Sequence, residues 1–316
     1  MIDINNAKSW TVLEVFSLTV SSGADRLFAN GLQQVRIRVA IRAVDAEGEI
    51  VRLSNKEMNS LELVDHYSRQ AIAYTESPSI TPAGRWSWGN NRDSRYRYFP
   101  TGQTRSAQEE DEIDLMDIST NSNVQYRDVY VRTRADAPLH IGARLTRGDR
   151  VIFTTSEDSS VTLTPVTSPT YRPGDYNFQA LEVQSNGTIS FDYRPFGLNV
   201  GGVNMEFRSF HMASLVKLGN SNIITPAGFT GFARPGEYSI NYSSGIVIGP
   251  QQIRSGYVKV GQPVVVVSRA LVVHPGQLSA PVREASISAV DMYGNNHRVN
   301  VRYKSTDSLN TDLELY

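Results

Sequence analysis

Six side chains between residues 84 and 99 are of types that make strong intermolecular contacts. Trp and Tyr rings and Arg guanidinium groups are enriched at binding hot spots, and aromatic faces also stack on sugar rings. The spacing Trp-Ser-Trp places both tryptophans on one face of an extended segment. The six predicted contacts for a protein or glycan partner are Trp86, Trp88, Arg92, Arg95, Tyr96 and Tyr98. The alternative is that these aromatics pack a satellite core beneath a long loop.

A run of carboxylates follows directly, from Glu109 to Asp117. Calcium prefers several oxygen ligands on a flexible loop, which makes Asp111, Asp114 and Asp117 candidates for binding it, although the spacing lacks the glycine and terminal glutamate of an EF-hand. Two alternatives remain open. The run is a solvated acidic loop, or it pairs with the arginine stretch of its own or a neighbouring subunit. No other cofactor is expected.

Catalytic motifs are absent from the sequence. It has no Gly-x-Ser-x-Gly elbow, no His-Glu-x-x-His helix and no phosphate-binding loop. The chain has no cysteine, and therefore no thiol nucleophile, thiolate metal site or disulfide. Its five histidines show no metal-ligand spacing, although distant residues can converge in a fold. We therefore expect a protein that is not an enzyme.

The overall charge argues against general nucleic-acid binding. Lys and Arg number 31 against 32 Asp and Glu, so no net field attracts phosphates. The longest apolar runs are too short for a transmembrane helix. The first residues carry an acid where a secretory peptide has a basic region, so no signal peptide is expected. The expected location is extracellular or at the cell surface by a route without such a signal, or cytoplasmic before release.

These side chains must be positioned by β-strands, because helical periodicity is nearly absent and short alternating stretches recur between turn residues. In the clearest strand, Gln34 to Val44, four aliphatic residues alternate with arginines, which predicts one buried and one wet face. Asp45 to Gly48 supply a turn and Ile50 to Leu53 return as the hairpin partner. A short helix is predicted over Asn55 to Leu63, with Ser54 and Glu57 as a capping box.

Two prolines, Pro165 and Pro169, and the sequence Arg172-Pro173-Gly174 mark a linker. The predicted domains are 1–168 and 169–316, the first a β-sandwich and the second a β-sandwich or jelly-roll-like domain. The two share one hexapeptide pattern, since Ala43-Val44-Asp45-x-x-Gly48 recurs as Ala289-Val290-Asp291-x-x-Gly294. Either duplication or a common hairpin solution accounts for the repeat.

The first domain also resembles a known family. An Asn30-Gly31 turn, the alternating strand from Val35 to Ile41, and Asp45-x-x-Gly48 together resemble the opening of the immunoglobulin-like modules of bacterial invasin and intimin-type adhesins. The resemblance covers residues 15–65 and more loosely 126–165. It implies an immunoglobulin-like sandwich in which residues from about 72 to 123 are an insertion. The stretch from Glu49 to Arg52 departs from the family, which usually has a proline there.

The sequence thus favours an all-β, non-enzymatic bacterial protein of adhesion or assembly type that presents aromatic and arginine-rich loops to a protein or glycan partner. Two alternatives of other classes stay open. One is a secreted toxin or injected effector component. The other is a self-assembling particle, sheath or fibre subunit, that is, a homo-oligomer joined through strand edges and complementary charges.

Overall fold

The computed structural model contains two compact units, Met1–Ser168 (unit 1) and Pro169–Tyr316 (unit 2). The division falls in the proline-containing segment where the sequence places the linker. Both units consist of β-strands and loops, which confirms the all-β prediction, and α1 (Asn55–Asn59) is the one α-helix in the part of the chain described. The residues described are 9–78, 84–101, 123–148, 150–154, 159–181, 183–185, 187–218, 225–242, 249–273, 281–305 and 311–316.

The described residues of unit 1 form two sheets. Sheet I has the order β1-β3-β8-β7-β6, with β4 paired to β3, and sheet II has the order β10-β9-β11-β2, with β5 paired to β9. The strands of sheet I are β1 (Val12–Val20), β3 (Val35–Val44), β4 (Ile50–Val51), β6 (Ala73–Tyr74), β7 (Trp86–Gly89) and β8 (Gln125–Thr133). Those of sheet II are β2 (Arg26–Phe28), β5 (Glu62–Asp65), β9 (Leu139–Arg147), β10 (Arg150–Phe153) and β11 (Val161–Val166).

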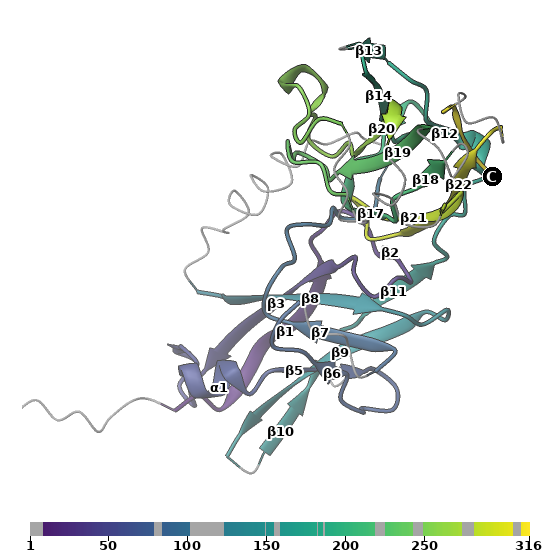
Figure 1. Ribbon diagram of the computed structural model, residues 1–316. Helices are drawn as coiled ribbons and strands as arrows, with labels where there is room; N and C mark the ends of the chain where they lie inside the picture. Colours follow the sequence, from purple (N-terminus) through teal and green to yellow (C-terminus); the bar gives the residue numbers. More distant parts are fainter. Residues whose placement is uncertain are drawn as a thin grey trace, which may run out of the picture. The chain divides into compact units, whose positions relative to one another are not determined.

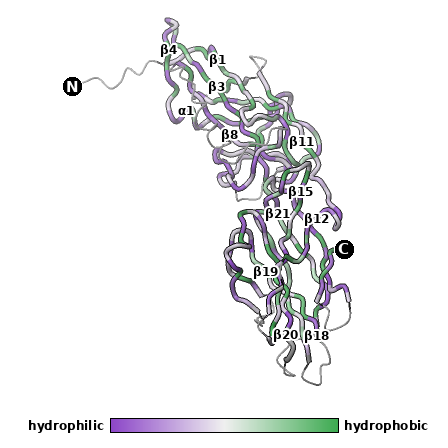
Figure 2. The backbone as a smooth tube through the Cα atoms, turned by 90° about the horizontal axis from the view of Figure 1, so that it is seen from above, coloured by the Kyte–Doolittle hydropathy of each residue, from purple (hydrophilic) through white to green (hydrophobic). Residues whose placement is uncertain are grey.

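Strand β3 lies between β1 and β8 and pairs antiparallel with both (Figure 1). Val35, Ile37, Val39 and Ile41 are at most 1% exposed and pack in the core of unit 1. The predicted strand is confirmed, because the alternation sends every second side chain to the same face. Hydrophobic positions recur along the strands of both units (Figure 2).

The predicted capping box forms at α1. The Ser54 hydroxyl accepts from the Glu57 N–H at 3.3 Å, and the Glu57 carboxylate accepts from the Ser54 N–H at 2.8 Å. The helix ends earlier than Leu63, because Glu62–Asp65 pairs with β9 as strand β5. Burial opposes ionisation of Glu57, but the hydrogen bonds from Ser54 and from the Trp10 indole hold the pKa of Glu57 below its usual value.

The described part of segment 72–123 belongs to the sandwich. Strand β7 pairs antiparallel with β8, and β6 pairs parallel with β7, so both extend sheet I. The acidic run Glu109–Asp117, with the calcium candidates Asp111, Asp114 and Asp117, lies outside the described residues.

The described residues of unit 2 form three sheets. Sheet III has the order β13-β14-β20-β19-β18, sheet IV the order β17-β21-β22-β23 and sheet V the order β12-β15-β16. Sheet III comprises β13 (Val183–Ser185), β14 (Ile189–Pro195), β18 (Val216–Leu218), β19 (Thr225–Ala233) and β20 (Val264–Val273). Sheet IV comprises β17 (Phe207–Met212), β21 (Glu284–Asp291), β22 (Asn296–Tyr303) and β23 (Leu313–Leu315). Sheet V comprises β12 (Tyr176–Asn177), β15 (Gly197–Val200) and β16 (Val203–Asn204), and two 3-10 helices are η2 (Pro173–Asp175) and η3 (Ser255–Tyr257).

Strand β20 shows why unit 2 has more than one core. All four valines from Val264 to Val267 are at most 2% exposed. Val265 and Val267 pack in the large aromatic cluster of unit 2, whereas Val264 and Val266 pack in a second cluster with Tyr193. A strand covered on both faces is continuously apolar rather than alternating.

The repeated Asp-x-x-Gly hexapeptide forms the same backbone hairpin in both units. The Asp45 N–H donates to Glu49 O at 2.9 Å and the Asp291 N–H donates to Asn295 O at 3.0 Å. Gly48 and Gly294 adopt φ of 83° and 84°, which only glycine reaches without strain. Local turn chemistry therefore gives the same result in two different surroundings.

Candidate functional site

The two predicted contact tryptophans face the interior of unit 1. Trp88 is 3% exposed, belongs to the core, and donates its indole N–H to Ile72 O at 3.1 Å. Trp86 is partly buried and packs against the same core. The two rings share a face as the spacing predicts, but that face is the inner one, because β7 extends the sandwich. Trp88 is therefore a core residue, which corrects its prediction as a partner contact, and Trp86 exposes only part of its ring.

The other four predicted contacts make pairs within the chain. The Arg92 guanidinium lies 4.3 Å from the ring centroid of Tyr98, which is only 7% exposed. Arg95 donates to both carboxylate oxygens of Asp93, at 2.9 and 2.7 Å, and lies 5.4 Å from the ring of Tyr96. The structure thus brings these residues together as an ordered segment, in which Arg95 remains exposed.

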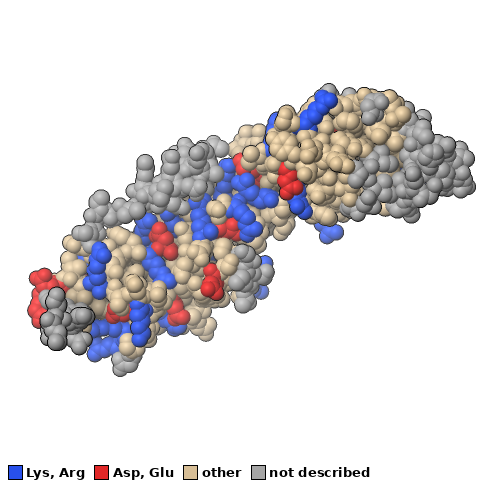
Figure 3. Space-filling view, turned by 60° about the vertical axis from the view of Figure 1, so that its left-hand side comes forward, with Lys and Arg blue, Asp and Glu red and all other residues tan. Residues whose placement is uncertain are grey.

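Four arginines, which we call the arginine face, project from sheet I on the side opposite the core. They are Arg36, Arg38 and Arg42 on β3 and Arg132 on β8. Arg38 donates to both carboxylate oxygens of Asp128, at 2.8 and 2.9 Å, and Arg42 pairs with Glu14. Figure 3 shows Lys and Arg side chains gathered over unit 1, with Asp and Glu between them.

The arginine face is not the wet surface that the alternation predicts. Arg36 is 1% exposed and Arg132 is 3% exposed. Arg36 donates to Ser21 O at 2.9 Å, and Arg132 donates to Pro78 O and to the Thr75 hydroxyl. Burial lowers the pKa of Arg132, opposed in part by an acidic neighbour. An outward-pointing side chain is buried only where other parts of the chain cover the sheet, which a single strand's pattern does not show.

A tight turn after β5, Asp65–Gln70, is the most exposed aromatic feature of unit 1, and we call it the Tyr67 turn. Tyr67 is 73% exposed. The Asp65 carboxylate accepts from the N–H groups of Tyr67 and Ser68 at 3.0 and 2.7 Å, and Asp65 O accepts from the Arg69 N–H at 2.9 Å. The Ser68 N–H holds the pKa of Asp65 below its usual value. The turn is therefore fixed by an ionised carboxylate at neutral pH.

Arg69 is the one non-glycine residue with positive φ, 60°, among the residues described. Such a conformation is strained for a side chain larger than asparagine and is concentrated at functional sites. Its guanidinium lies 5.0 Å from the ring centroid of Phe153 on β10. The turn thus presents both a tyrosine and an arginine at the surface.

Two histidines flank the Tyr67 ring. The His66 N–H donates to His140 O at 2.8 Å, beside the pairing of β5 with β9. The ring of Tyr67 lies 5.1 Å from that of His66 and 5.0 Å from that of His140. Sequence reasoning missed this cluster, because register alone brings His66 and His140 together. In the described ranges, no group of three or more His, Asp or Glu side chains is placed to hold a metal ion.

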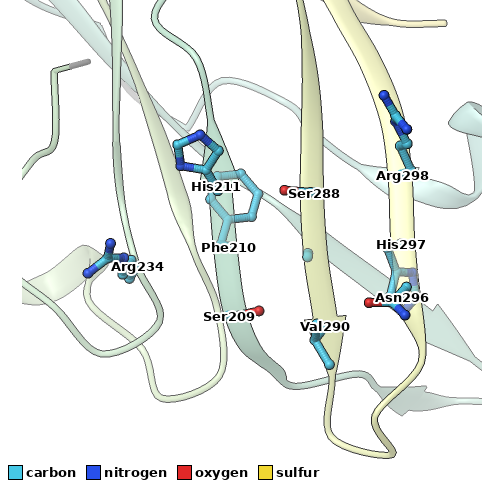
Figure 4. A pocket seen from close by; sticks show the side chains of 10 residues that line it. Ser209, Phe210, His211, Arg234, Ser288, Val290, Asn296, His297 and Arg298 are labelled. Carbon is cyan, nitrogen blue, oxygen red and sulfur yellow. The ribbon is translucent and has the colours of Figure 1, made fainter. Parts of the chain in front are cut away.

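A shallow pocket of about 520 Å³ lies on the exposed side of sheet IV (Figure 4). His211 on β17 pairs directly with Ser288 on β21, which pairs with Arg298 on β22. Ser288 is short and its two neighbours are long, so the middle strand is the floor of a hollow. Arg234, which follows the last residue of β19, lies at one side. No sequence motif signals this cross-strand row of His211, Ser288 and Arg298, because its members come from three separate strands.

A buried hydrogen-bonded chain lies behind this sheet. The Asp291 carboxylate, 0% exposed, is 3.1 Å from His297 Nε2, and the Tyr176 hydroxyl is 3.0 Å from His297 Nδ1. A carboxylate only accepts, so His297 Nε2 donates to Asp291, and in the neutral imidazole the Tyr176 hydroxyl then donates to Nδ1. The Tyr171 ring stacks on His297 at 5.5 Å. These groups are enclosed by protein and serve to position the hairpin.

No family model matches the sequence, and no curated protein matches it. Among solved structures, the chain is similar to the C-terminal domain of the Streptococcus pyogenes antigen I/II-family protein AspA, at 6% identity and a TM-score of 0.24. The match covers 95% of this chain and 98% of that chain. A TM-score this low carries no argument for function. Within the described residues, no helix is long and apolar enough to cross a membrane.

Proposed function

We propose that the chain is a non-enzymatic binding protein of adhesion or assembly type, acting at the cell surface, and that it contacts a protein or glycan partner through the Tyr67 turn. One observation carries the proposal: Tyr67 is 73% exposed on a turn whose backbone is already fixed by Asp65. A preorganised contact loses little conformational entropy on binding. The resemblance of residues 15–65 to adhesin modules gives the same expectation.

The chemistry of the Tyr67 turn supports a contact role. Tyrosine and arginine are among the residue types that dominate interface energies. Burying an exposed ring contributes about 1.5–3 kcal/mol at ordinary transfer free energies. Arg69 adds a planar cation that forms paired hydrogen bonds with carboxylates. In the predicted loop 86–98 the tryptophans face inward, and Arg95, although exposed, is held by two hydrogen bonds to Asp93.

The test compares beads coated with the full chain on epithelial monolayers and on a printed glycan array. Tyr67→Ala should weaken binding at least tenfold, which is about 1.4 kcal/mol, and Tyr67→Phe should retain most of it. Tyr238→Ala is the matched control, because Tyr238 is also exposed, at 51%, but lies in unit 2. Signal on the array identifies a glycan partner and signal on cells alone identifies a protein.

Two results would overturn the assignment. One is equal binding by the wild-type chain and a folded Tyr67→Ala variant, with circular dichroism showing that both are folded. The other is adhesion no greater than that of albumin-coated beads on both surfaces.

A further inference from the structure

The pocket on sheet IV has a lining of one electrostatic character. Its side chains include Arg234, Arg298 and His211, together with the hydroxyls of Ser209 and Ser288, and no Asp or Glu is among the described residues that line it. Arg234 has a loose ion pair with Glu237, at 3.8 Å, with both side chains about half exposed. The hollow therefore favours an anion over a neutral or cationic ligand.

The spacing of the row determines what size of ligand fits. His211, Ser288 and Arg298 stand on three adjacent strands. Neighbouring strands lie about 4.8 Å apart, so the backbones of the two outer residues are about 9–10 Å apart. A single six-membered sugar ring fits over Ser288 between them. The pocket volume of about 520 Å³ is in the range of small-molecule sites.

The flanking side chains are arranged for two kinds of contact. Arg298 is exposed and presents the planar donor set that matches a carboxylate or sulfate group. The His211 ring packs nearly perpendicular to the buried Phe232 ring, with centroids 5.6 Å apart. In the next row, Ser209 and Asn296 both pair with Val290 and supply donors and acceptors for hydroxyl groups.

We propose that this hollow, framed by His211, Ser288 and Arg298, is a second binding site, and that it takes an acidic saccharide. Arg298 binds the carboxylate or sulfate group of the sugar, and Arg234 adds positive charge at the side. The Ser288 floor admits the ring, and the hydroxyls of the sugar meet Ser209 and Asn296. The site lies in unit 2 and is independent of the Tyr67 turn in unit 1, so either assignment can fail without the other.

The experiment titrates the full chain with N-acetylneuraminic acid, glucuronic acid, a sulfated glucosamine, neutral N-acetylglucosamine and inorganic sulfate, and follows binding by saturation-transfer NMR. Three acidic sugars distinguish carboxylate from sulfate as the recognised group. At least one acidic sugar should bind at millimolar concentration and the neutral sugar should not. Arg298→Gln should weaken that binding at least fivefold.

Arg302→Gln is the matched control. Arg302 lies on the same strand and the same face, but it pairs with Glu314 at 2.7 Å and does not line the pocket. Its substitution should leave the affinity unchanged. Equal weakening by both substitutions would show a diffuse charge effect and overturn the site.

Three further outcomes contradict the proposal. An acidic sugar that binds the Arg298→Gln variant as well as the wild type places the site elsewhere. Inorganic sulfate that binds as tightly as every acidic sugar removes the role of Ser209 and Asn296 in recognising hydroxyls. No binding of any acidic sugar at 10 mM, well above the about 1 mM range of weak specific affinities, excludes the ligand class.

Discussion

The two Asp-x-x-Gly hairpins have the same backbone and very different surroundings. In unit 1 the turn from Ala46 to Glu49 is exposed, and the Asp45 carboxylate accepts from the N–H groups of Glu47 and Glu49 at 3.1 and 2.8 Å. In unit 2 the Asp291 carboxylate repeats these two bonds to the backbone and adds contacts with side chains.

The added contacts come from residues that the unit 1 hairpin lacks. Counting from the aspartate, unit 2 has Asn295 and His297 where unit 1 has Glu49 and Val51. The amide of Asn295 donates to the Asp291 carboxylate at 3.2 Å, and Nε2 of His297 lies 3.1 Å from the same carboxylate. A short motif therefore specifies a turn, while the residues that follow it decide how far the rest of the fold depends on that turn.

The two hairpins should differ most in the stability that is lost when the aspartate is replaced by alanine. Asp291→Ala leaves buried donors of His297, Asn295 and the backbone without an acceptor, and should lower the free energy of unfolding of unit 2 by about 3–5 kcal/mol. Asp45→Ala removes the hydrogen bonds from the backbone N–H groups of Glu47 and Glu49, which lie in an exposed turn, and should cost about 1–2 kcal/mol. Urea unfolding measures both.

The two units can be followed separately in that experiment. The three tryptophans are Trp10, Trp86 and Trp88, all in unit 1, so indole fluorescence reports unit 1 and far-UV circular dichroism reports both. Equal losses for the two alanine variants would mean that the side-chain contacts of Asp291 add nothing to the shared turn.

The second-largest expected effect is a loss of stability of unit 2 at alkaline pH, through the Tyr176 hydroxyl. Burial, with nearby Tyr171, Asp175 and Asp291, raises the pKa of Tyr176 to about 12. The unfolded chain loses this proton near pH 10, so the contribution of Tyr176 is complete below pH 10 and is lost as the pH rises to about 12. Two pKa units correspond to at most about 3 kcal/mol. Unit 2 should therefore lose stability between pH 10 and 12.

Tyr176→Phe isolates this contribution. At pH 8 it should cost about 1 kcal/mol through the lost hydrogen bond to His297. Between pH 10 and 12 the variant should show a smaller loss of stability than the wild type. Urea unfolding at each pH gives the free energy of unfolding. If this free energy fell with pH as steeply in the variant as in the wild type, the alkaline transition would belong to other tyrosines.

The smallest expected effect is the cost of replacing the positive-φ glycine, which both hairpins have. Gly48 and Gly294 have nearly the same positive φ, so Gly48→Ala and Gly294→Ala should each cost about 1–2 kcal/mol for the same backbone reason. Gly174→Ala is the control, because Gly174 has no positive φ and nothing within 4 Å of the added methyl group. The midpoints of urea unfolding measure these costs. If Gly174→Ala lowered the stability as much as Gly48→Ala, the positive φ would not be the cause of the loss.

Much of the fold follows from local patterns in the sequence. The alternation from Val35 to Ile41 determines a strand with one buried face, Ser54 and Glu57 determine a capped helix start, and Asp45 and Gly48 determine a turn. Each depends on residues within a few positions of one another, where backbone sterics and short-range hydrogen bonds decide the conformation.

The candidate sites depend on contacts that local patterns do not contain. The Trp86 and Trp88 spacing determines a shared face, but only the pairing of β7 with β8 decides that this face is the core. Register between distant strands places His66 beside His140 and aligns His211, Ser288 and Arg298. Local sequence patterns are enough to predict the strands, turns and all-β class of this protein. Which side chains meet depends on the folded chain, because strand order and register are set by the packing of the whole sheet.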